Sequence, residues 1–349
     1  MLRALGLGDL LTSVPALRGL RTAYPDHEIV LAAPAELAAV AQSIDAVDRL
    51  LVTTASDREV PAAIPWHGEV PEIAIDMHGN GPPSHRFLEE LRPRLLMAFA
   101  HPETPWIDGP EWRSHEHERY RWCRLLAAYG IASDPDDLWL PVPAEPSPAP
   151  GAILIHPGAH APARRWPAER FASVASTLTE MGHQIVITAS AGEAGLAWRV
   201  AREAGLPSGA LHIGTSEHNG GLPFTGLAAL VAGARLVLCG DTGIAHLASA
   251  LAVPSVVLFG PICPHVWGPP RLPRHLVLWH AGAPGDPNGA VPDPTLLRIT
   301  VREVLAAVMT QLSAWDQFGD AEGAEPLGAQ GPAEDFCRAW WSRPDSGRP

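Results

Sequence analysis

Short apolar runs alternate with longer amphipathic stretches through the second half of the chain. The runs are continuous instead of alternating with polar residues, which is typical of strands in a parallel sheet covered on both faces. Repeated strand–helix units of this kind predict a doubly wound, Rossmann-like α/β domain. We expect strands at 152–155, 184–188, 211–213, 236–239 and 255–259, and helices at 167–181, 193–203, 225–233 and 244–251.

The first half repeats the pattern less regularly. We expect strands at 2–7, 28–32, 47–52 and 72–75, and helices at 10–24, 35–43 and 119–129. Pro15 should kink the first of these helices, and Thr225 should cap the helix that begins there. A proline-rich stretch at 141–150 reads as a linker. The fold class is therefore α/β, with two domains at 1–145 and 146–314 that face a cleft, and a flexible tail at 315–349.

The basic residues narrow the possible chemistry, because every one of them is arginine. The chain has 25 basic residues, none of them lysine, against 38 acidic residues, and its formal net charge is −13. An acidic chain does not coat nucleic acid, which requires a positive surface. The absence of lysine excludes Schiff-base nucleophiles and P-loops. A phosphate ligand would have to be bound by arginines, backbone N–H groups and helix N-termini.

The cellular location follows from weaker signals. Asp9 interrupts the first apolar stretch, so no signal peptide is visible. The four cysteines form no CxxC pair, which fits a reducing compartment. The longest uncharged run, 247–264, contains serine, proline and glycine and reads as a helix end followed by a strand, not as a membrane span. We expect a cytoplasmic protein.

The first segment that could carry chemistry is 5–11, where Gly6 and Gly8 flank the end of a predicted strand and Asp9 stands where the next helix begins. Asp9 could be a helix N-cap that accepts a backbone N–H. It could equally be a general base that takes a proton from a hydroxyl group. The GxGxxG fingerprint of dinucleotide-binding proteins is not met, because Leu11 stands at the third glycine position.

The second segment, 240–246, lies between a strongly apolar strand and a helix. Free backbone N–H groups and the positive end of the helix converge there and could bind phosphate without lysine. Thr242 adds a hydroxyl donor, and Gly243 permits a close approach. Asp241 and Thr242 could instead merely cap the helix, with His246 as a core histidine.

The third segment, 156–167, combines a glycine turn with Arg164 and Arg165 before a helix start. Paired arginines could clamp a pyrophosphate. The alternative is that Trp166 packs at the helix start and both arginines lie in solvent. A further run, His115–Glu118, has poor spacing for a metal site on a helix, so we expect surface residues or residues that stand behind a site.

Together these segments resemble glycosyltransferase family 9, the heptosyltransferase-like enzymes of the GT-B fold. The matching stretches are 3–18, 156–167 and 240–261, and they occur in this order across both predicted domains. The resemblance implies a GT-B enzyme with two Rossmann-like domains. The N-terminal domain would bind the acceptor, and the C-terminal domain would bind a nucleotide-sugar donor.

The resemblance also implies an inverting transfer of a sugar from a nucleotide diphosphate, without a metal or other cofactor. Asp9 matches the general base of the family, which takes the proton of the acceptor hydroxyl. Thr242 and Gly243 match the diphosphate-binding turn, with Asp241 and His246 beside it. Their donors would stabilise the charge that grows on the leaving diphosphate.

Further donor-binding residues follow from the same resemblance. Arg164 lies near a position where heptosyltransferases carry a lysine, so an arginine must substitute for it here. Glu193 is placed to bind ribose hydroxyls, and Leu222 lies near the adenine side. The residues expected to contact the acceptor lie in or next to one loop: Asp76, His78, Asn80, Ser84 and Arg86.

The expected partners are a nucleotide sugar, with ADP-heptose first, and a glycan or lipid-linked acceptor. We expect a monomer that binds no nucleic acid. A lipid-linked acceptor leaves open peripheral contact with the inner face of the cytoplasmic membrane. Two other functions remain open at this point. One is a nucleotide-sugar epimerase or hydrolase of the same fold, and the other is a non-catalytic nucleotide-sugar-binding protein.

Overall fold

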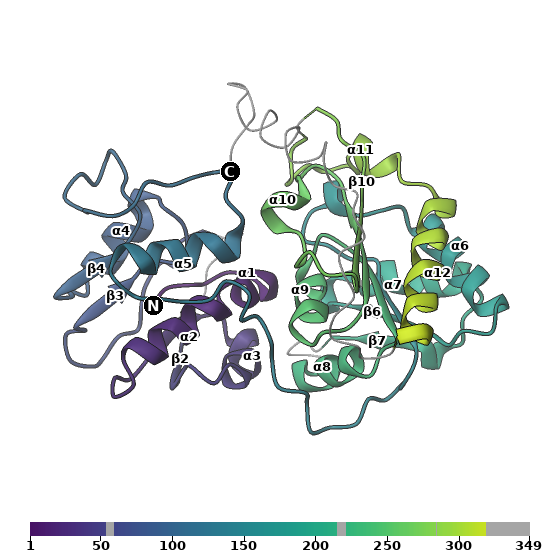
Figure 1. Ribbon diagram of the computed structural model, residues 1–349, viewed down its shortest axis with the longest axis horizontal. Coiled ribbons are helices and arrows are strands. Elements are labelled where there is room, and N and C mark those ends of the chain that lie inside the picture. Colours follow the sequence, from purple (N-terminus) through teal and green to yellow (C-terminus); the bar gives the residue numbers. More distant parts are fainter. Residues whose placement is uncertain (54–58, 215–220, 284, 319–349) are drawn as a thin grey trace. The chain divides into compact units, whose positions relative to one another are not determined.

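The protein, seen here as a computed structural model, consists of two compact units, Met1–Leu140 and Pro141–Pro349. The structure describes residues 1–53, 59–214, 221–283 and 285–318 (Figure 1). The boundary along the chain falls between Leu140 and Pro141, at the start of the proline-rich linker and slightly before the boundary predicted after residue 145. Each unit is described by itself below.

Unit 1 is built around a small parallel sheet. Its strands are β1 (Val30–Ala33), β2 (Arg49–Val52), β3 (Ile73–Ile75) and β4 (Leu95–Met97). Its helices are α1 (Leu7–Thr12), α2 (Val14–Ala23), α3 (Ala38–Ser43), α4 (Pro82–Glu89) and α5 (Glu118–Ala128), with a short 3₁₀ helix at Ala35–Leu37. β1 pairs with β2, and β3 pairs with β4, all in parallel.

Leu2 joins these two strand pairs. It forms parallel bridges with Ala32 of β1 and with Asp76 just after β3. Its N–H donates to the carbonyl of Ile75 at 3.0 Å, and its carbonyl accepts from the N–H of Met77 at 3.1 Å. The chain therefore runs β2–β1–Leu2–β3–β4 across the unit, with the first segment in the middle. This arrangement places the residues that follow Leu2 and β3 at the same edge, since parallel strands share their carboxyl ends.

Unit 2 contains a six-stranded parallel sheet, which confirms the predicted α/β class. Its strands are β5 (Ile153–His156), β6 (Ile185–Ala189), β7 (Leu211–Ile213), β8 (Leu236–Gly240), β9 (Ser255–Phe259) and β10 (His275–Trp279). They lie in the order β10–β9–β8–β5–β6–β7. This is the strand order of the dinucleotide-binding Rossmann fold, in which the direction of winding reverses between the first and fourth strands. Here that switch point lies between β5 and β8.

Helices cover both faces of this sheet. The helices of unit 2 are α6 (Ala168–Glu180), α7 (Ala194–Glu203), α8 (Phe224–Ala232), α9 (Gly243–Ala250), α10 (Pro264–Trp267), α11 (Pro294–Leu297) and α12 (Val301–Phe318). Short 3₁₀ helices lie at Pro162–Arg164, Ala191–Glu193 and Ser208–Ala210. Figure 1 shows α6, α7 and α12 on one side of the sheet and α8 and α9 on the other.

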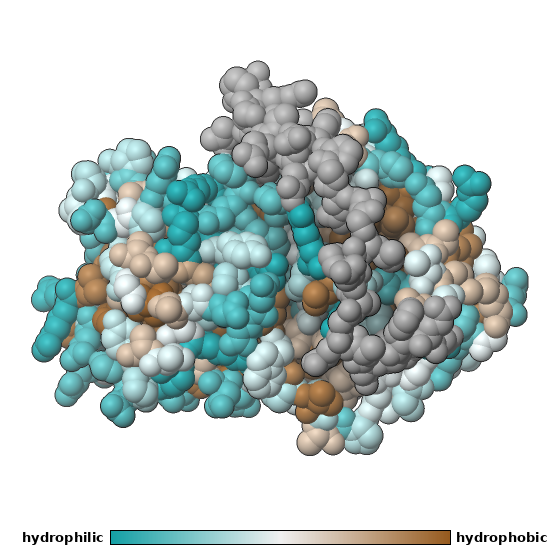
Figure 2. Space-filling model, in the orientation of Figure 1, coloured by the Kyte–Doolittle hydropathy of each residue, from teal (hydrophilic) through white to brown (hydrophobic). Residues whose placement is uncertain are grey.

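The apolar side chains are concentrated in the cores. Strands β6, β8 and β9 are buried along their whole length, which explains their uninterrupted apolar sequences. On the face drawn in Figure 2, the apolar side chains of the described residues lie in small separate groups among polar ones. None of the helices in the described ranges has the length and apolar content needed to span a membrane.

Several expected elements differ in the structure. The predicted strand 2–7 is reduced to the bridges of Leu2, because the turn at Leu5 and Gly6 leads directly into α1. The predicted helix 10–24 is broken at Ser13, and Pro15 lies in the first turn of α2, where its missing N–H costs no hydrogen bond. Pro223, not Thr225, is the N-cap of α8.

Other elements were not predicted at all. The short strand β4, the edge strand β10 and the helices α4 and α12 fall into this group. Since α12 continues to Phe318, residues 315–318 belong to a helix and not to a flexible tail. The remainder of the predicted tail, 319–349, lies outside the described residues.

A glycine in α2 tests how closely this helix packs. A Cβ at Gly19 would lie 2.6 Å from the Cβ of Ser133 and 2.8 Å from the carbonyl oxygen of Ala132. Alanine is the better helix former by about 1 kcal/mol, but overpacking of this kind costs about 1–3 kcal/mol. We expect Gly19→Ala to lower the free energy of unfolding, measured by urea denaturation.

The matched control is Gly195 of α7, where an added Cβ would meet no atom within 4 Å. Gly195→Ala should raise the free energy of unfolding by about 0.5–1 kcal/mol, since only the entropy of the unfolded chain changes. Stabilisation by both substitutions would show that α2 does not pack against 132–133 as described.

Candidate functional site

The switch point of unit 2 gathers loops that carry polar residues. β5 ends at His156 and β8 at Gly240, and these two strands are neighbours in the sheet. β6 lies on the other side of β5 and leads through Ser190 to Glu193. All three loops therefore begin at the same edge. Ligands of open α/β sheets bind at this edge, outside the carboxyl ends of the strands.

The turn between β8 and α9 has the form of an anion site. Thr242 is the N-cap residue of α9, with extended backbone at φ −158° and ψ 168°, but its side chain makes no capping hydrogen bond. The alternative that Thr242 merely caps the helix is therefore not realised. Gly243 is the first residue of the helix, so the first free N–H groups of α9 begin here. The turn can present N–H groups and a hydroxyl to a negative ligand.

An ion pair joins this turn to the third sequence segment. The guanidinium of Arg164 lies with Nη1 3.6 Å from Oδ2 of Asp241, and both side chains are mostly buried. The backbone of Arg164 also approaches the turn, because a Cβ at Gly240 would lie 3.0 Å from the carbonyl oxygen of Arg164. The structure therefore brings the two predicted donor-binding segments together.

A second arginine–carboxylate pair lies at the end of β6. Nη2 of Arg165 is 3.5 Å from Oε1 of Glu193, and the hydroxyl of Ser190 donates to Oε2 of Glu193 at 2.6 Å. Gly158 lies directly against this carboxylate, since a Cβ there would be 2.4 Å from its carbon. Trp166 is buried and donates its indole N–H to the carbonyl of Ile299 at 3.0 Å. Trp166 thus packs as expected at the helix start, but the arginines are not simply in solvent.

The other predicted donor residues lie at the same edge. His246 of α9 makes an edge-to-face contact with Trp267, with ring centroids 5.9 Å apart. Leu222 forms a bridge with Gly214 just after β7, and its N–H donates to the carbonyl of Ile213 at 2.7 Å. Burial lowers the pKa of His156, which pairs with the hydroxyl of Thr188 at 3.0 Å.

Asp9 in unit 1 is the third residue of α1, not its N-cap, and it is 5% exposed. Its Oδ2 accepts the N–H of Gly6, the actual N-cap, at 3.1 Å. Asp9 therefore does satisfy one backbone donor at the helix start. Its other carboxylate oxygen, Oδ1, lies 3.8 Å from Nη2 of Arg3. The carboxylate is thus held from two directions.

Asp76 follows β3 at the same edge, and its side chain is fully buried. Its Oδ1 accepts the N–H of His78 at 2.9 Å, and its Oδ2 lies 3.6 Å from Nε2 of His85. Burial raises the pKa of Asp76 to about 6, while hydrogen bonds from Ser84, His78 and Gly79 oppose the shift. Burial lowers the pKa of His85. Oδ1 of Asp76 thus fastens the loop that leads into α4, while Oδ2 has no hydrogen-bond partner within the described part of the chain.

Of the remaining acceptor-side residues, Ser84 is buried and the other three are more accessible. His78 and Asn80 are half-buried in the loop between β3 and α4, and the side chain of Arg86 on α4 is exposed, 3.8 Å from Glu103. Among the residues that the structure describes, no group of three or more His, Cys, Asp or Glu side chains could hold a metal ion.

Sequence reasoning missed the partners of Asp9. Arg3 is 1% exposed and contacts Glu118 of α5, a residue from the run expected at the surface or behind a site. Of the two alternatives for this run, Glu118 fits a residue behind a site, since it is 5% exposed, whereas His115 is exposed. An arginine inside an apolar strand was the available signal that a buried acidic partner must exist.

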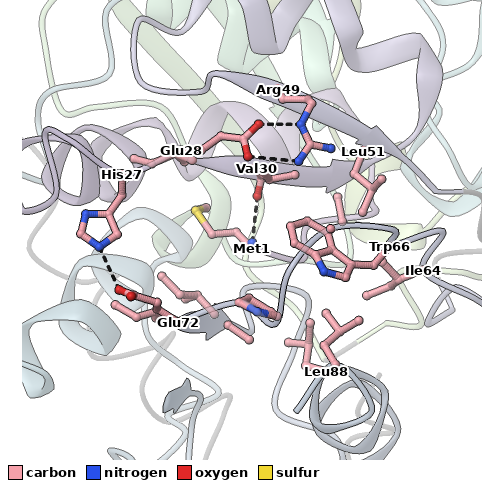
Figure 3. Close-up of a pocket in the computed structure, with 18 of the residues that line it drawn as sticks. Met1, His27, Glu28, Val30, Arg49, Leu51, Ile64, Trp66, Glu72 and Leu88 are labelled. Carbon is pink, nitrogen blue, oxygen red and sulfur yellow. Dashed lines mark hydrogen bonds and ion pairs between the residues drawn. The ribbon is translucent and has the colours of Figure 1, made fainter. Parts of the chain in front are cut away.

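A cavity of about 530 Å³ opens at the opposite edge of unit 1. Figure 3 shows Met1, Trp66, Ile64 and Leu88 along its wall. It lies near the amino ends of β1 and β3, and charged residues on its rim pair with one another, as Arg49 does with Glu28 at 2.7 Å. Because ligands of parallel sheets bind at the carboxyl ends, this cavity is not the candidate site.

Comparison with a family model covers two of the three segments, 156–167 and 240–246. Residues 143–283 match the model of glycosyltransferase family 9 (heptosyltransferase). The lipopolysaccharide heptosyltransferase 1 of Pseudomonas aeruginosa is 35% identical over 121 residues, which cover 34% of this chain and 31% of that protein. The lipopolysaccharide heptosyltransferase 2 of Salmonella typhimurium is 29% identical over 164 residues, 45% of each. The matches therefore span less than half the length of these curated relatives.

Solved structures extend the likeness to most of the chain. The ADP-heptose lipopolysaccharide heptosyltransferase II of Escherichia coli superimposes with a TM-score of 0.68 at 19% identity, covering 90% of this chain and 98% of that one. The fold is therefore the GT-B fold of glycosyltransferases. Within this fold, the segment 143–283 is similar to glycosyltransferase family 9, which agrees with the resemblance noted in the sequence.

The buried carboxyl group of Asp76 predicts an unusual pH dependence. Because its folded-state pKa is raised from 3.8 to about 6, its contribution to stability is complete below pH 4 and is lost as the pH rises through 6. Asp76→Asn carries no such loss. At pH 7 we expect the variant to be more stable than the wild type by up to about 3 kcal/mol, at about 1.4 kcal/mol per pH unit. Urea unfolding between pH 4 and 8 measures this difference.

Asp48 provides a control of opposite sign. Hydrogen bonding from the N–H of Ile29, together with Arg21, lowers the pKa of Asp48. Asp48→Asn should therefore be less stable than the wild type at pH 7, with the difference shrinking at low pH. A pH-independent difference for Asp76→Asn would mean that this carboxyl group is not buried as described.

Proposed function

We propose that the chain is an inverting glycosyltransferase that moves heptose or a related sugar from a nucleotide-diphosphate sugar, ADP-heptose first, to a hydroxyl of a glycan or glycolipid. The observation that carries this proposal is the turn at Asp241–Gly243. It lies at the switch point of the sheet, inside the segment that matches the family 9 model. The names of the similar proteins, which include lipopolysaccharide heptosyltransferases and an ADP-heptose enzyme, support the choice of donor.

The proposed reaction is a single displacement at the anomeric carbon. The carboxylate of Asp9 takes the proton of the acceptor hydroxyl, and the hydroxyl oxygen attacks the face opposite the diphosphate. A new C–O bond forms as the bond to the diphosphate oxygen breaks. The electron pair of that bond leaves with the nucleoside diphosphate, which carries the developing negative charge.

Unit 2 would stabilise this leaving group. The N–H groups of α9 at Gly243 and the hydroxyl of Thr242 can donate to phosphate oxygens, and Arg164 stands beside them. Glu193 is available for ribose hydroxyls, and Leu222 for the base. Metal independence is part of the proposal, because these donors supply positive charge without a bound cation.

Unit 1 would position the acceptor. Asp76 holds the loop of His78 and Asn80 by its hydrogen bond to the N–H of His78, and the exposed guanidinium of Arg86 is available for an anionic group of the acceptor. We propose that the enzyme acts as a cytoplasmic monomer, with peripheral membrane contact if the acceptor is lipid-linked.

The role of Asp9 is tested by Asp9→Asn, which retains an oxygen for the N–H of Gly6 but cannot accept the proton. We expect transfer from ADP-heptose to heptose-deficient lipopolysaccharide to fall about 10²–10⁴-fold. Binding of ADP, measured by calorimetry, should be unchanged. Asp26→Asn, on the exposed loop after α2, is the matched control. Transfer at the wild-type rate by Asp9→Asn would exclude Asp9 as the base.

The donor is tested by thermal unfolding with ADP-, GDP- and UDP-sugars. A ligand present at 100 times its Kd should stabilise the protein by about 2.7 kcal/mol. We expect the largest stabilisation from ADP-heptose, and its loss in Thr242→Val but not in the exposed Thr225→Val. A preference for another nucleotide sugar would exclude the heptosyl assignment. Donor turnover without any acceptor would favour an epimerase or hydrolase, and binding without turnover a non-catalytic protein.

A further inference from the structure

Arg3 is the most deeply buried cation near the proposed base. Its side chain is 1% exposed and uses all three nitrogens. Nε donates to the carbonyl of Asp9 at 3.0 Å, Nη1 donates to the carbonyl of Met77, and Nη2 donates to Oε2 of Glu118 at 3.3 Å. The guanidinium also lies over the ring of Trp122, 4.5 Å from its centroid. Each nitrogen of the guanidinium therefore has a partner, and the ring of Trp122 packs against it.

Glu118, which binds Arg3, is itself held in place by neighbouring side chains. It is the first residue of α5 and is 5% exposed. Oε2 also accepts the indole N–H of Trp122 at 3.0 Å, and Oε1 pairs with the guanidinium of Arg121. Because both of its oxygens are engaged by residues of its own helix, Glu118 can hold Arg3 without moving itself.

On its other side Arg3 contacts Asp9 through two groups. Nε donates to the backbone carbonyl of Asp9, and Nη2 lies 3.8 Å from Oδ1 of its carboxylate. The N–H of Gly6 binds Oδ2. The chain of contacts Glu118–Arg3–Asp9 thus links a helix start to the carboxylate across more than one hundred residues of sequence.

We propose that Glu118 and Arg3 are positioning residues for the base Asp9: Glu118 fixes Arg3, and Arg3 fixes both the direction and the charge environment of the Asp9 carboxylate. This inference rests on the proposed function. The positive charge of Arg3 favours the ionised carboxylate, and the negative charge of Glu118 opposes that effect. Neither residue touches the substrates in this proposal.

Two opposite shifts follow from these charges. Arg3→Met removes the cation, so the carboxylate becomes easier to protonate and the acidic limb of the pH–rate profile should move up by about one pH unit. Glu118→Gln removes the opposing charge, so the limb should move down. Loss of structure alone would not move the two variants in opposite directions.

A third variant separates geometry from charge. Arg3→Lys keeps the charge but cannot donate to all three partners at once. We expect kcat to fall about 10–100-fold, with the limb and the KM for ADP-heptose near the wild-type values. Arg21→Gln, which loses the surface pair with Asp48, is the control and should leave kcat and the limb unchanged. If Arg3→Met fails to fold, Trp122→Phe provides the second test of the same network, because it removes one hydrogen-bond donor to Glu118. We expect Trp122→Phe to lower kcat as Arg3→Lys does.

The other titrating groups around Arg3 must be held constant. The charged and titratable groups packed near this network in the described part of unit 1 are the amino group of Met1, Glu116, Arg121, Arg124, Asp76, His78 and His85. Asp76 and the amino group of Met1, each with a pKa of about 6, titrate within the measured range. The profiles are therefore measured in the Asp76→Asn background as well, where the same opposite shifts should persist.

The outcomes separate this inference from the proposed function. If Asp9→Asn is inactive and the limbs of Arg3→Met and Glu118→Gln move apart, the inference holds. If Asp9→Asn is inactive but both limbs stay in place, or both move the same way, Asp9 is the base and only the positioning role is overturned. If Asp9→Asn is fully active, the base assignment is wrong and the positioning role falls with it.

Discussion

The buried guanidinium of Arg3 connects three elements of unit 1 at the edge where the chemistry of this unit is expected. Burying a charge is unfavourable unless every donor finds an acceptor, and Arg3 meets this condition with two carbonyls, a carboxylate and an aromatic ring. The acceptors come from α1, from the loop after β3 and from α5. Removing one partner would leave a buried charge uncompensated, at a cost of about 3–5 kcal/mol. The positions of Asp9 and of the loop of Met77 are therefore coupled to one another.

In unit 2 the arginines of the candidate site are paired with carboxylates but are less deeply buried than Arg3. Arg164 lies 3.6 Å from a carboxylate oxygen of Asp241, and Arg165 lies 3.5 Å from one of Glu193. The two arginine side chains are 16% and 33% exposed. The pair of Arg165 reaches solvent further and can be exchanged at smaller cost than the pair of Arg164, whose side chains are mostly buried. A diphosphate bound at the turn of Thr242 would offer these arginines a second anion. The absence of lysine makes the arginines the only permanently charged cations that such a ligand could meet.

Much of this arrangement could be predicted from local sequence. Continuous apolar runs identified five of the six strands of unit 2, and the motif at 240–246 lies where a parallel sheet binds its ligands. The partners of Asp9 could not be predicted, because Arg3 and Glu118 are far apart in sequence and only the fold brings them together. Burial was equally hidden at Asp76, which looks like an ordinary loop aspartate but lies under α4 without exposed surface. The strand β4 was missed because its three residues give no period to recognise.

The two units share one strand order but place side chains of opposite charge after the first strand segment: Asp9 in unit 1 and Arg164 in unit 2. In each unit the first strand segment lies in the middle of the sheet, and the chain crosses to its other side at the fourth strand. In unit 1 the helix begins almost at once after Leu2, so the short turn brings a carboxylate, Asp9, into the first turn of α1. In unit 2 a longer loop separates β5 from α6, and its 3₁₀ turn brings Arg164 to the switch point instead. Under the proposed function, this difference in loop length explains why the first unit supplies a base for the incoming hydroxyl. The second unit, with arginines and helical N–H groups at the same place, is suited to the outgoing diphosphate.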